Sequence, residues 1–426
     1  MKSLICLILA MRTEPVACLG GCWDARNVSG VSTSRWAGLL SLAESSEPPT
    51  QLCDYRTMTK ELAWDAIGER VRQARLSLGL SQSDLAQAVG LDRTMIAKIE
   101  LGKRRLNAIE LVRLSSKLGV SLDYLIQPQP RVISHRSAPL TEDTDTTITR
   151  QSQRMEIVLT EWLREVRQLV DLGTLSPREC LIYPNRVSSE HDAREAARWL
   201  RDRLDLGNEP IGSMAAVCER AGQLLLVTDV QGEGASVVDG DVAVAVVSRY
   251  PDPGRRRATA AHELGHLVLG DEYSSDLGLH ASRAEREALV DAFAAEFLLP
   301  VTAIMAFANA NAIDLPMQRK HVVELAARYR TSWSLALRQA ELADAISPNT
   351  RRQWSASNPT LAEFKEAVGW TPQPDLDDEL VPPSFAQAVI EAWRQHLITG
   401  ARAGALMHGQ ITEQDLPIRD EPEIAP

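Results

Sequence analysis

The sequence Ala-His-Glu-Leu-Gly-His-Leu at residues 261–267 contains two histidines four positions apart, with a glutamate directly after the first. On an α-helix each residue advances by about 100°, so His262 and His266 return to nearly the same face. Their imidazoles are then placed to bind one metal ion together. Glu263 would lie beside that ion without binding it, where its carboxylate can take a proton from an activated water.

A catalytic zinc ion usually takes three protein ligands and keeps one position open. In zinc proteases with a glycine and a third histidine soon after the motif, those residues would stand where this chain has Leu269 and Glu272, so that arrangement is excluded. Glu287 is the better candidate, because it begins a helical stretch of small and apolar residues in which an unpartnered carboxylate would be costly. Asp291, one turn later, is placed to accept the outer N–H of a ligand histidine. The competitors for the third ligand are Glu285, Asp271, Asp276 and His280.

Three segments resemble the ImmA/IrrE family of zinc metallopeptidases: residues 257–269, 287–300 and 326–338. The family pattern has His-Glu-x-x-His, then a glutamate that starts Glu-x-x-Ala-Asn-x-Phe-Ala before a Leu-Met-Pro-like close, then a helix with Tyr and Ser. This sequence has Val290, Asp291 and Leu299 where that pattern has Ala, Asn and Met. None of these departures removes a candidate ligand.

The resemblance implies a zinc metallo-endopeptidase with a zincin-like fold. The ligands would be His262, His266 and Glu287, and Glu263 would be the catalytic base. The family also implies a substrate, namely a helix-turn-helix repressor, often in phage, mobile-element or DNA-damage circuits. For the donor that stabilises the developing oxyanion, the sequence leaves His280 and His321 as alternatives.

Residues 66–125 predict a domain of five short helices. Ile67, Val71, Ala74 and Leu78 repeat at helical spacing before Gly79. Ser81 is expected to begin the second helix, Gly90 to form the turn and Asp92 to begin the third. Two further helices are expected at 107–118 and 121–125. A glycine turn between the second and third helices is typical of a helix-turn-helix domain.

The same region resembles the Xre/Cro-type repressor domain, in residues 68–72, 79–82, 85–86, 99–105 and 118–125. The resemblance implies that Gln82 contacts double-stranded operator DNA, and that the third helix faces the major groove. The groove-facing residues would be Arg93, Thr94, Met95 and Lys98. Arg104 and Arg105 would contact phosphate. The alternative for each residue is a solvated polar position on a helical bundle.

The 426 residues carry a net charge of −11, but the charge is uneven. Residues 58–127 hold 11 Lys and Arg against 8 Asp and Glu, which favours one DNA-facing module on an acidic body. The six cysteines include no Cys-x-x-Cys pair, so neither a disulfide scaffold nor a zinc ribbon is indicated. A cytoplasmic protein without a membrane segment is therefore expected.

The chain divides into five predicted parts. Residues 1–57 are a disordered extension or the product of a wrongly assigned start, 58–127 the helix-turn-helix domain and 128–150 a flexible linker. Residues 151–348 form the zinc metallopeptidase domain and 349–426 a helical C-terminal extension with a loose tail. Strands are expected at 224–228 and 242–247, and residues 255–257 read as a solvated basic loop. The fold class is mostly α with a small β-sheet (α+β).

Two functions of different classes follow. In the first, a DNA-binding transcriptional regulator carries a zinc-dependent peptidase that cuts a regulatory protein, either a helix-turn-helix repressor or itself. In the second, the zinc domain of the DNA-binding regulator is a sensor or partner-binding module without proteolytic turnover. Zinc is the expected cofactor in both, and a homodimer is a further expectation.

Overall fold

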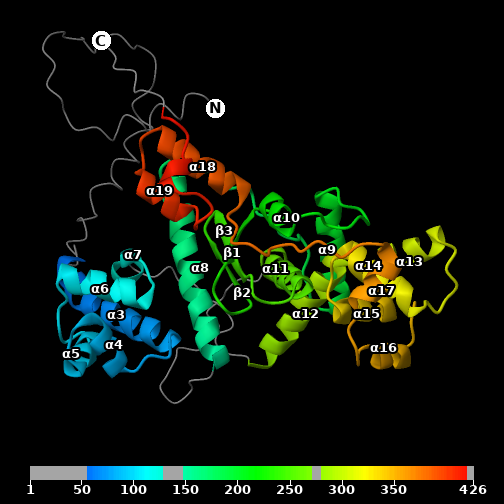
Figure 1. The fold of residues 1–426 in the computed structure, drawn as a ribbon, viewed down its shortest axis with the longest axis horizontal. Coiled ribbons are helices and arrows are strands. Elements are labelled where there is room, and N and C mark those ends of the chain that lie inside the picture. The colour runs from blue at the N-terminus through cyan, green and yellow to red at the C-terminus, as the bar shows by residue number, and fades with distance from the viewer. Residues whose placement is uncertain (1–54, 128–146, 271–279, 420–426) are drawn as a thin grey trace, which may run out of the picture. The chain divides into compact units, whose positions relative to one another are not determined.

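The structure is a computed structural model that describes residues 55–127, 147–270 and 280–419, without the side chains of 55–63 and 280–284. Contacts group Thr59–Pro426 into one unit, and Met1–Met58 into another of which only the end is described. Helices surround one three-stranded sheet (Figure 1), which confirms the predicted α+β class. The expectations for residues 1–54, and for 128–146 of the linker, lie outside the described residues.

The first five described helices match the expected helix-turn-helix arrangement. They are α3 (Tyr55–Ser77), α4 (Gln82–Val89), α5 (Arg93–Glu100), α6 (Ala108–Leu118) and α7 (Leu122–Ile126). Ser81 and Asp84 form a capping box at the start of α4, and Gly90 ends that helix at φ 72°, where a glycine costs least. Asp92 stands at the cap position of α5 but its side chain makes no capping hydrogen bond.

Helix α8 (Thr147–Asp171) is a 25-residue helix. Most of its buried residues join a core with the sheet, whereas Ile157 belongs to the core of the helix-turn-helix domain. Trp162 is fully buried, and its indole N–H donates to the carbonyl of Leu224 at 3.0 Å.

The sheet consists of β1 (Gln223–Thr228), β2 (Gly234–Asp239) and β3 (Val242–Ser248) in the order β1-β3-β2. Strand β1 runs parallel to β3, and β2 runs antiparallel to it. The structure confirms both expected strands and adds β2, which the sequence analysis missed.

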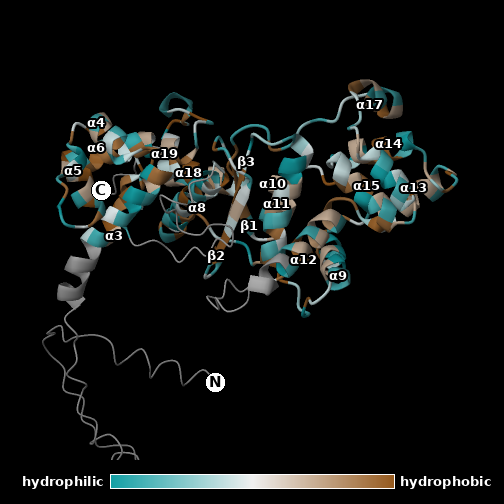
Figure 2. Cartoon of the chain, turned by 90° about the horizontal axis from the view of Figure 1, so that it is seen from below, coloured by the Kyte–Doolittle hydropathy of each residue, from teal (hydrophilic) through white to brown (hydrophobic). Residues whose placement is uncertain are grey.

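Alternate residues of β3 face opposite sides of the sheet. Val242, Val244 and Val246 join the core that contains α8. Ala243, Ala245 and Val247 join the larger core beneath α11 (Pro253–Val268). Figure 2 shows the apolar strands between these two helices. Because successive strand residues point to opposite faces, a strand buried on both faces reads as one continuous apolar run.

The described residues form ten further helices. They are α9 (Glu190–Arg203), α10 (Met214–Arg220), α12 (His280–Leu298), α13 (Val301–Ala310), α14 (Arg319–Tyr329), α15 (Trp333–Leu342), α16 (Pro348–Trp354), α17 (Leu361–Val368), α18 (Pro383–Arg394) and α19 (Gly400–Leu406), with a 3₁₀ turn at Glu413–Asp415. Helix α12 packs against α9 on one side and α11 on the other. Residues 330–332 separate α14 from α15.

One helical stretch among the described residues, Glu285–Ala310, is long and apolar enough to cross a membrane by length and composition. In its most apolar window, 67% of the residues are buried inside the protein. The buried core helix of a globular domain passes the same test, and burial accounts for the apolar composition here.

The prediction of a solvated basic loop at residues 255–257 is wrong, because these residues form part of α11. Arg256 and Arg257 are buried, with 6% and 0% of their surface exposed. Arg256 donates to the carbonyl of Arg249 at 2.6 Å, and Arg257 pairs with Asp375. A buried guanidinium needs such partners, and the sequence pattern could not reveal a partner 118 residues away.

Candidate functional site

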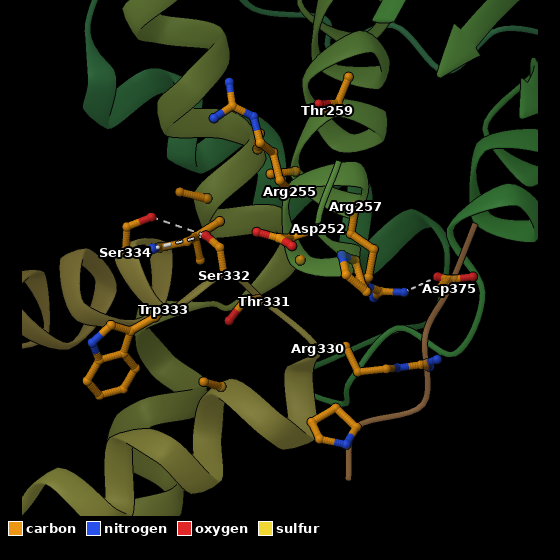
Figure 3. A pocket seen from close by; sticks show the side chains of 18 of the residues that line it. Asp252, Arg255, Arg257, Thr259, Arg330, Thr331, Ser332, Trp333, Ser334 and Asp375 are labelled. Atoms are coloured by element: carbon orange, nitrogen blue, oxygen red, sulfur yellow. Dashed lines mark hydrogen bonds and ion pairs between the residues drawn. The ribbon is translucent and has the colours of Figure 1, made fainter. Parts of the chain in front are cut away.

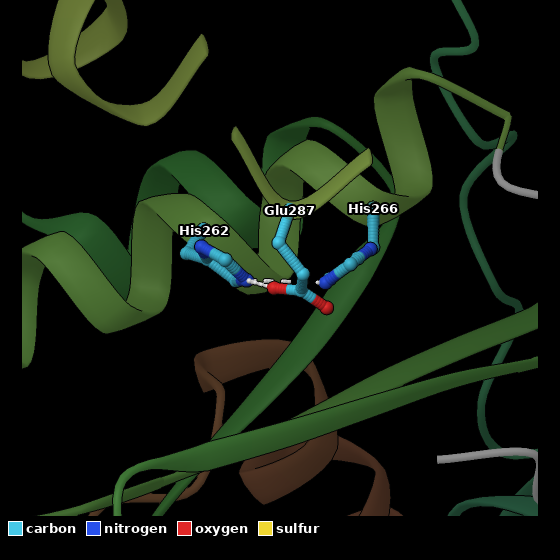
Figure 4. Close-up of side chains that lie close together, drawn as sticks. All are labelled: His262, His266 and Glu287. Atoms are coloured by element: carbon cyan, nitrogen blue, oxygen red, sulfur yellow. Dashed lines mark hydrogen bonds and ion pairs between the residues drawn. The ribbon is translucent and has the colours of Figure 1, made fainter. Parts of the chain in front are cut away.

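Helix α11 presents His262 and His266 on one face, and Glu287 reaches them from α12 (Figure 4). Nε2 of His262 lies 3.1 Å from Nε2 of His266 and 3.1 Å from Oε2 of Glu287. One ligand atom from each of the three residues lies within 4.8 Å of the other two. Both histidines are nearly buried, and the glutamate is partly exposed.

This donor set fits a divalent zinc ion. Two imidazole nitrogens and one carboxylate oxygen are ligands that zinc takes in catalytic sites. Tetrahedral ligands about 2.0–2.1 Å from zinc lie roughly 3.3–3.4 Å apart, which is close to the two 3.1 Å separations measured here. A bound metal explains three such atoms that converge in a buried site better than a structural hydrogen bond does.

Asp291 fixes the orientation of His262, as its spacing predicted. Its Oδ1 lies 2.9 Å from Nδ1 of His262, which leaves Nε2 directed at His266 and Glu287. The hydrogen bond from His262 is the main reason that the pKa of Asp291 falls below its usual value. A carboxylate on the outer nitrogen selects the tautomer that a ligand histidine needs.

Gly265 explains how α12 comes close enough to supply a ligand. A Cβ atom at this position would lie 2.9 Å from Cδ1 of Phe293 and 3.0 Å from Cγ1 of Val290. Both of those α12 side chains are fully buried. The glycine between the two histidines therefore removes the atom that would hold the helices apart.

Glu263 is 3% exposed and contacts the edge strand β2. Its Oε2 accepts a hydrogen bond from the hydroxyl of Ser236 at 2.7 Å, and its backbone carbonyl accepts one from Nε2 of Gln223 at 3.0 Å. The sequence analysis missed Ser236. Ser236 is the one hydroxyl residue between Ala235 and Val237 in an otherwise apolar run. Because β2 was not predicted, nothing in the sequence placed Ser236 near Glu263.

A cavity of about 860 Å³ opens beside the metal ligands. His262, Glu287 and Asp291 line one part of it, and residues 330–335 line another (Figure 3). The segment 372–375 from the C-terminal part of the chain also lines it. Its size suits several residues of a peptide, since ligand pockets of about 300–1,000 Å³ enclose a small molecule almost completely.

Arg257 and Asp375 tie this C-terminal segment to α11, as Figure 3 shows. Arg257 also donates to the carbonyl of Ile211 at 3.0 Å. Burial lowers the pKa of Arg257 to about 10, which leaves the guanidinium charged at neutral pH. Asp375 further accepts the backbone N–H of Met214 at 3.1 Å. The ion pair therefore joins three segments beside the cavity.

The other candidates from the sequence lie elsewhere. Glu285 is exposed and is not part of the ligand cluster. His321 stands in the first turn of α14, where its Nδ1 accepts the backbone N–H of Gln318 at 3.4 Å, and it does not line the cavity. Asp271, Asp276 and the side chain of His280 lie outside the described residues.

The DNA-contact candidates lie on α4 and α5. Arg93, Thr94 and Lys98 are exposed, and Met95 and Gln82 are partly exposed. These positions are compatible with a surface that contacts DNA.

A buried ion pair orients Gln82. Its Nε2 donates to Glu100 at 2.8 Å, and Glu100 accepts from Arg75 at 2.6 Å. Arg104 lies on the same domain but pairs with Glu110 at 2.6 Å, so its guanidinium already has a carboxylate partner.

Comparison with known families agrees with both parts of the chain. Residues 71–125 match the helix-turn-helix family model, and residues 218–340 match the model of the IrrE N-terminal-like domain. The second match contains β1 to β3, α11, α12 and the three candidate metal ligands.

Two curated relatives match only the N-terminal part. An uncharacterized transcriptional regulator in the ATPase CF(0) region of Rhodospirillum rubrum is 37% identical over 65 residues, which cover 15% of this chain and 60% of the relative. The SPbeta prophage-derived uncharacterized HTH-type transcriptional regulator YonR of Bacillus subtilis (strain 168) is 40% identical over 61 residues, or 14% and 56%. This chain thus spans less than two thirds of the length of either relative. It combines an Xre-type helix-turn-helix domain with an ImmA/IrrE-like domain of the metallopeptidase type.

Proposed function

We propose that the protein is a cytoplasmic DNA-binding transcriptional regulator whose second domain is a zinc-dependent endopeptidase. Its substrate is a regulatory protein, either a helix-turn-helix repressor or this chain itself. The observation that carries the proposal is the convergence of His262, His266 and Glu287, with Glu263 adjacent in the sequence. The two family matches and the relatives named as transcriptional regulators support the combination of roles.

The side chains of this site divide the work of peptide hydrolysis. A zinc ion bound by the three ligands would polarise the scissile carbonyl and acidify a water molecule. Glu263 accepts the proton from the attacking water and delivers it to the leaving amide nitrogen. Asp291 holds His262 in one tautomer, and Ser236 holds the carboxylate of Glu263 in one orientation.

Strand β2 offers a place for an extended substrate. It is one of the two edge strands of the described sheet and packs against α11, the helix that carries His262 and His266. An extended peptide can add to such an edge through main-chain hydrogen bonds. This mode binds backbone rather than side chains, so the cavity must supply the sequence preference.

The substitution Glu263→Gln tests the proposal, because it removes the base while keeping nearly the same shape. We expect zinc content and operator binding to stay near the wild-type values, while cleavage of a candidate repressor falls below detection. Zinc is measured by elemental analysis, with the double alanine substitution of His262 and His266 as the metal-free control. Regulation in cells that survives Glu263→Gln intact would favour the sensor function without turnover.

A further inference from the structure

Four arginines line the cavity beside the metal ligands, and three of them already have partners. Arg255 pairs with Glu233, and Arg257 pairs with Asp375. Arg330 donates to the backbone carbonyls of Ile211 and Gly212. In the described part of the chain, the fourth, Arg338, makes no hydrogen bond or ion pair.

Arg338 lies on the exposed side of α15, which packs against the ligand helix α12. It lines the same cavity as His262, Glu287 and Asp291. Arg338 therefore borders the space that a substrate would fill.

The charge balance of the cavity also favours an anionic ligand. The pairs formed by Arg255 and Arg257 are each neutral. A divalent ion would balance the negative charges of Glu287 and Asp291. The remaining charged residues that line the cavity are Arg330, Arg338 and Asp252, so one positive charge is in excess. An exposed arginine in such a setting binds a carboxylate with two parallel N–H···O bonds.

We infer that Arg338 selects peptide substrates that carry a carboxylate side chain close to the scissile bond. This inference rests on the proposed function, because it assigns a substrate class to the same cleft. Arg330 does not serve this purpose, since its guanidinium is held by backbone carbonyls. Arg338 is thus a specificity residue, and the metal ligands and Glu263 are independent of it.

The experiment measures peptide binding rather than turnover. The zinc-loaded full chain with Glu263→Gln is titrated with fluorescein-labelled octapeptide mixtures, in which one position at a time is fixed as either Glu or Gln. We expect the Glu mixture to bind about tenfold more tightly than its Gln partner at one or two positions, because a charge-assisted pair discriminates against the neutral amide.

The substitution Arg338→Met in the same background should abolish the preference for Glu. Arg338→Glu should reverse it in favour of mixtures with Lys at that position. Arg352→Met is the matched control, since Arg352 is an exposed arginine on α16 that does not line the cavity. Thermal unfolding of each variant checks that the fold is retained.

Equal binding of the Glu and Gln mixtures at every position would overturn the inference. So would a preference that persists in Arg338→Met or disappears in Arg352→Met. The proposed function would be overturned by a different result, namely a wild-type chain that cleaves no repressor. Such a chain can still discriminate Glu from Gln in this binding assay. The two failures are therefore distinguishable.

Discussion

The hydroxyl of Ser236 donates a 2.7 Å hydrogen bond to Oε2 of Glu263, and so joins the edge strand β2 to the helix that carries both histidine ligands. Gly234, two residues earlier, permits this approach. A Cβ atom there would lie 2.6 Å from Cγ2 of Thr259 and 3.2 Å from Cγ of Glu263. Strand β2 therefore orients the proposed base as well as forming the sheet edge.

Replacing Ser236 with alanine is expected to lower kcat for peptide cleavage by about tenfold, because the carboxylate of Glu263 loses a partner that fixes its orientation. KM should change little, since Ser236 does not line the cavity. Ser236→Thr should restore most of the rate, because it keeps the hydroxyl. Ser248→Ala, at a buried serine of β3, is the control for a general effect on the sheet. Equal losses in the two alanine variants would contradict a positioning role.

Replacing Gly265 with alanine is expected to weaken metal binding. The added methyl group would contact Phe293 and Val290 at distances that a packed core does not accept, so α12 must shift and carry Glu287 with it. Overpacking of this kind costs about 1–3 kcal/mol of unfolding free energy. Gly404→Ala in α19 is the control, because its nearest neighbours lie at 3.8 Å and 4.0 Å. Zinc affinity and thermal unfolding are the measurements, and unchanged zinc affinity in Gly265→Ala would rule out this role.

Replacing Asp291 with alanine is expected to lower zinc affinity by roughly 10–100-fold, because His262 loses the partner that selects its tautomer. Replacing Glu287 with alanine should lower the affinity more, since it removes a ligand. Competition with a chromogenic chelator measures both. If Asp291→Ala binds zinc as tightly as the wild type, the 2.9 Å contact is merely structural.

Replacing Arg93 with alanine is expected to weaken operator binding by roughly 1–3 kcal/mol at fixed salt if the side chain reads a base. Lys98→Ala should reduce the salt dependence of binding if the ammonium contacts a phosphate instead. Arg352→Ala, at an exposed arginine of α16 outside the helix-turn-helix domain, is the control. An Arg93→Ala protein with wild-type affinity would remove Arg93 from the interface.

A pH effect is expected where the C-terminal part of the chain meets α8. Burial alone would lower the pKa of His408, but its 2.7 Å hydrogen bond to Glu165 and the nearby charges of Glu379 and Glu161 outweigh burial, so the pKa is raised. A histidine with a raised folded-state pKa contributes full stability below its unfolded value of about 6.5. That contribution is lost as the pH rises through the folded-state pKa.

Thermal unfolding across this range tests the effect. The stability difference between the wild type and His408→Gln should shrink with increasing pH. A His408→Gln difference that is constant with pH would show that the histidine does not titrate as expected.

The convergence of His262, His266 and Glu287 could be predicted from the sequence. Two histidines four residues apart lie on the same face of any helix. Glu287 lies on a helical stretch of small and apolar residues, which indicates close packing against another helix. The contact of Asp291 with His262 followed from the same helical spacing. The five helices of the N-terminal domain could also be predicted from the sequence, since glycines and capping residues mark their ends.

The contacts that the sequence analysis missed join residues far apart in the chain. Arg257 meets Asp375 across 118 residues, and nothing in the run of three arginines distinguishes a buried guanidinium from a solvated one. Strand β2 was not predicted because it begins with a glycine, which is typical of a turn. Ser236 became recognisable only when β2 placed it against Glu263.

Helix α8 lies between the two segments that match known families, and neither match includes it. Its Ile157 nevertheless completes the core of the helix-turn-helix domain, and its neighbours Met155 and Leu159 complete the core of the sheet. A fragment that ends at residue 127 would lack Ile157 and expose the apolar residues that pack against it. A cut within α8 would remove core residues from both domains. Truncation or recombination that separates the two domains therefore leaves α8 with one of them and removes core residues from the other.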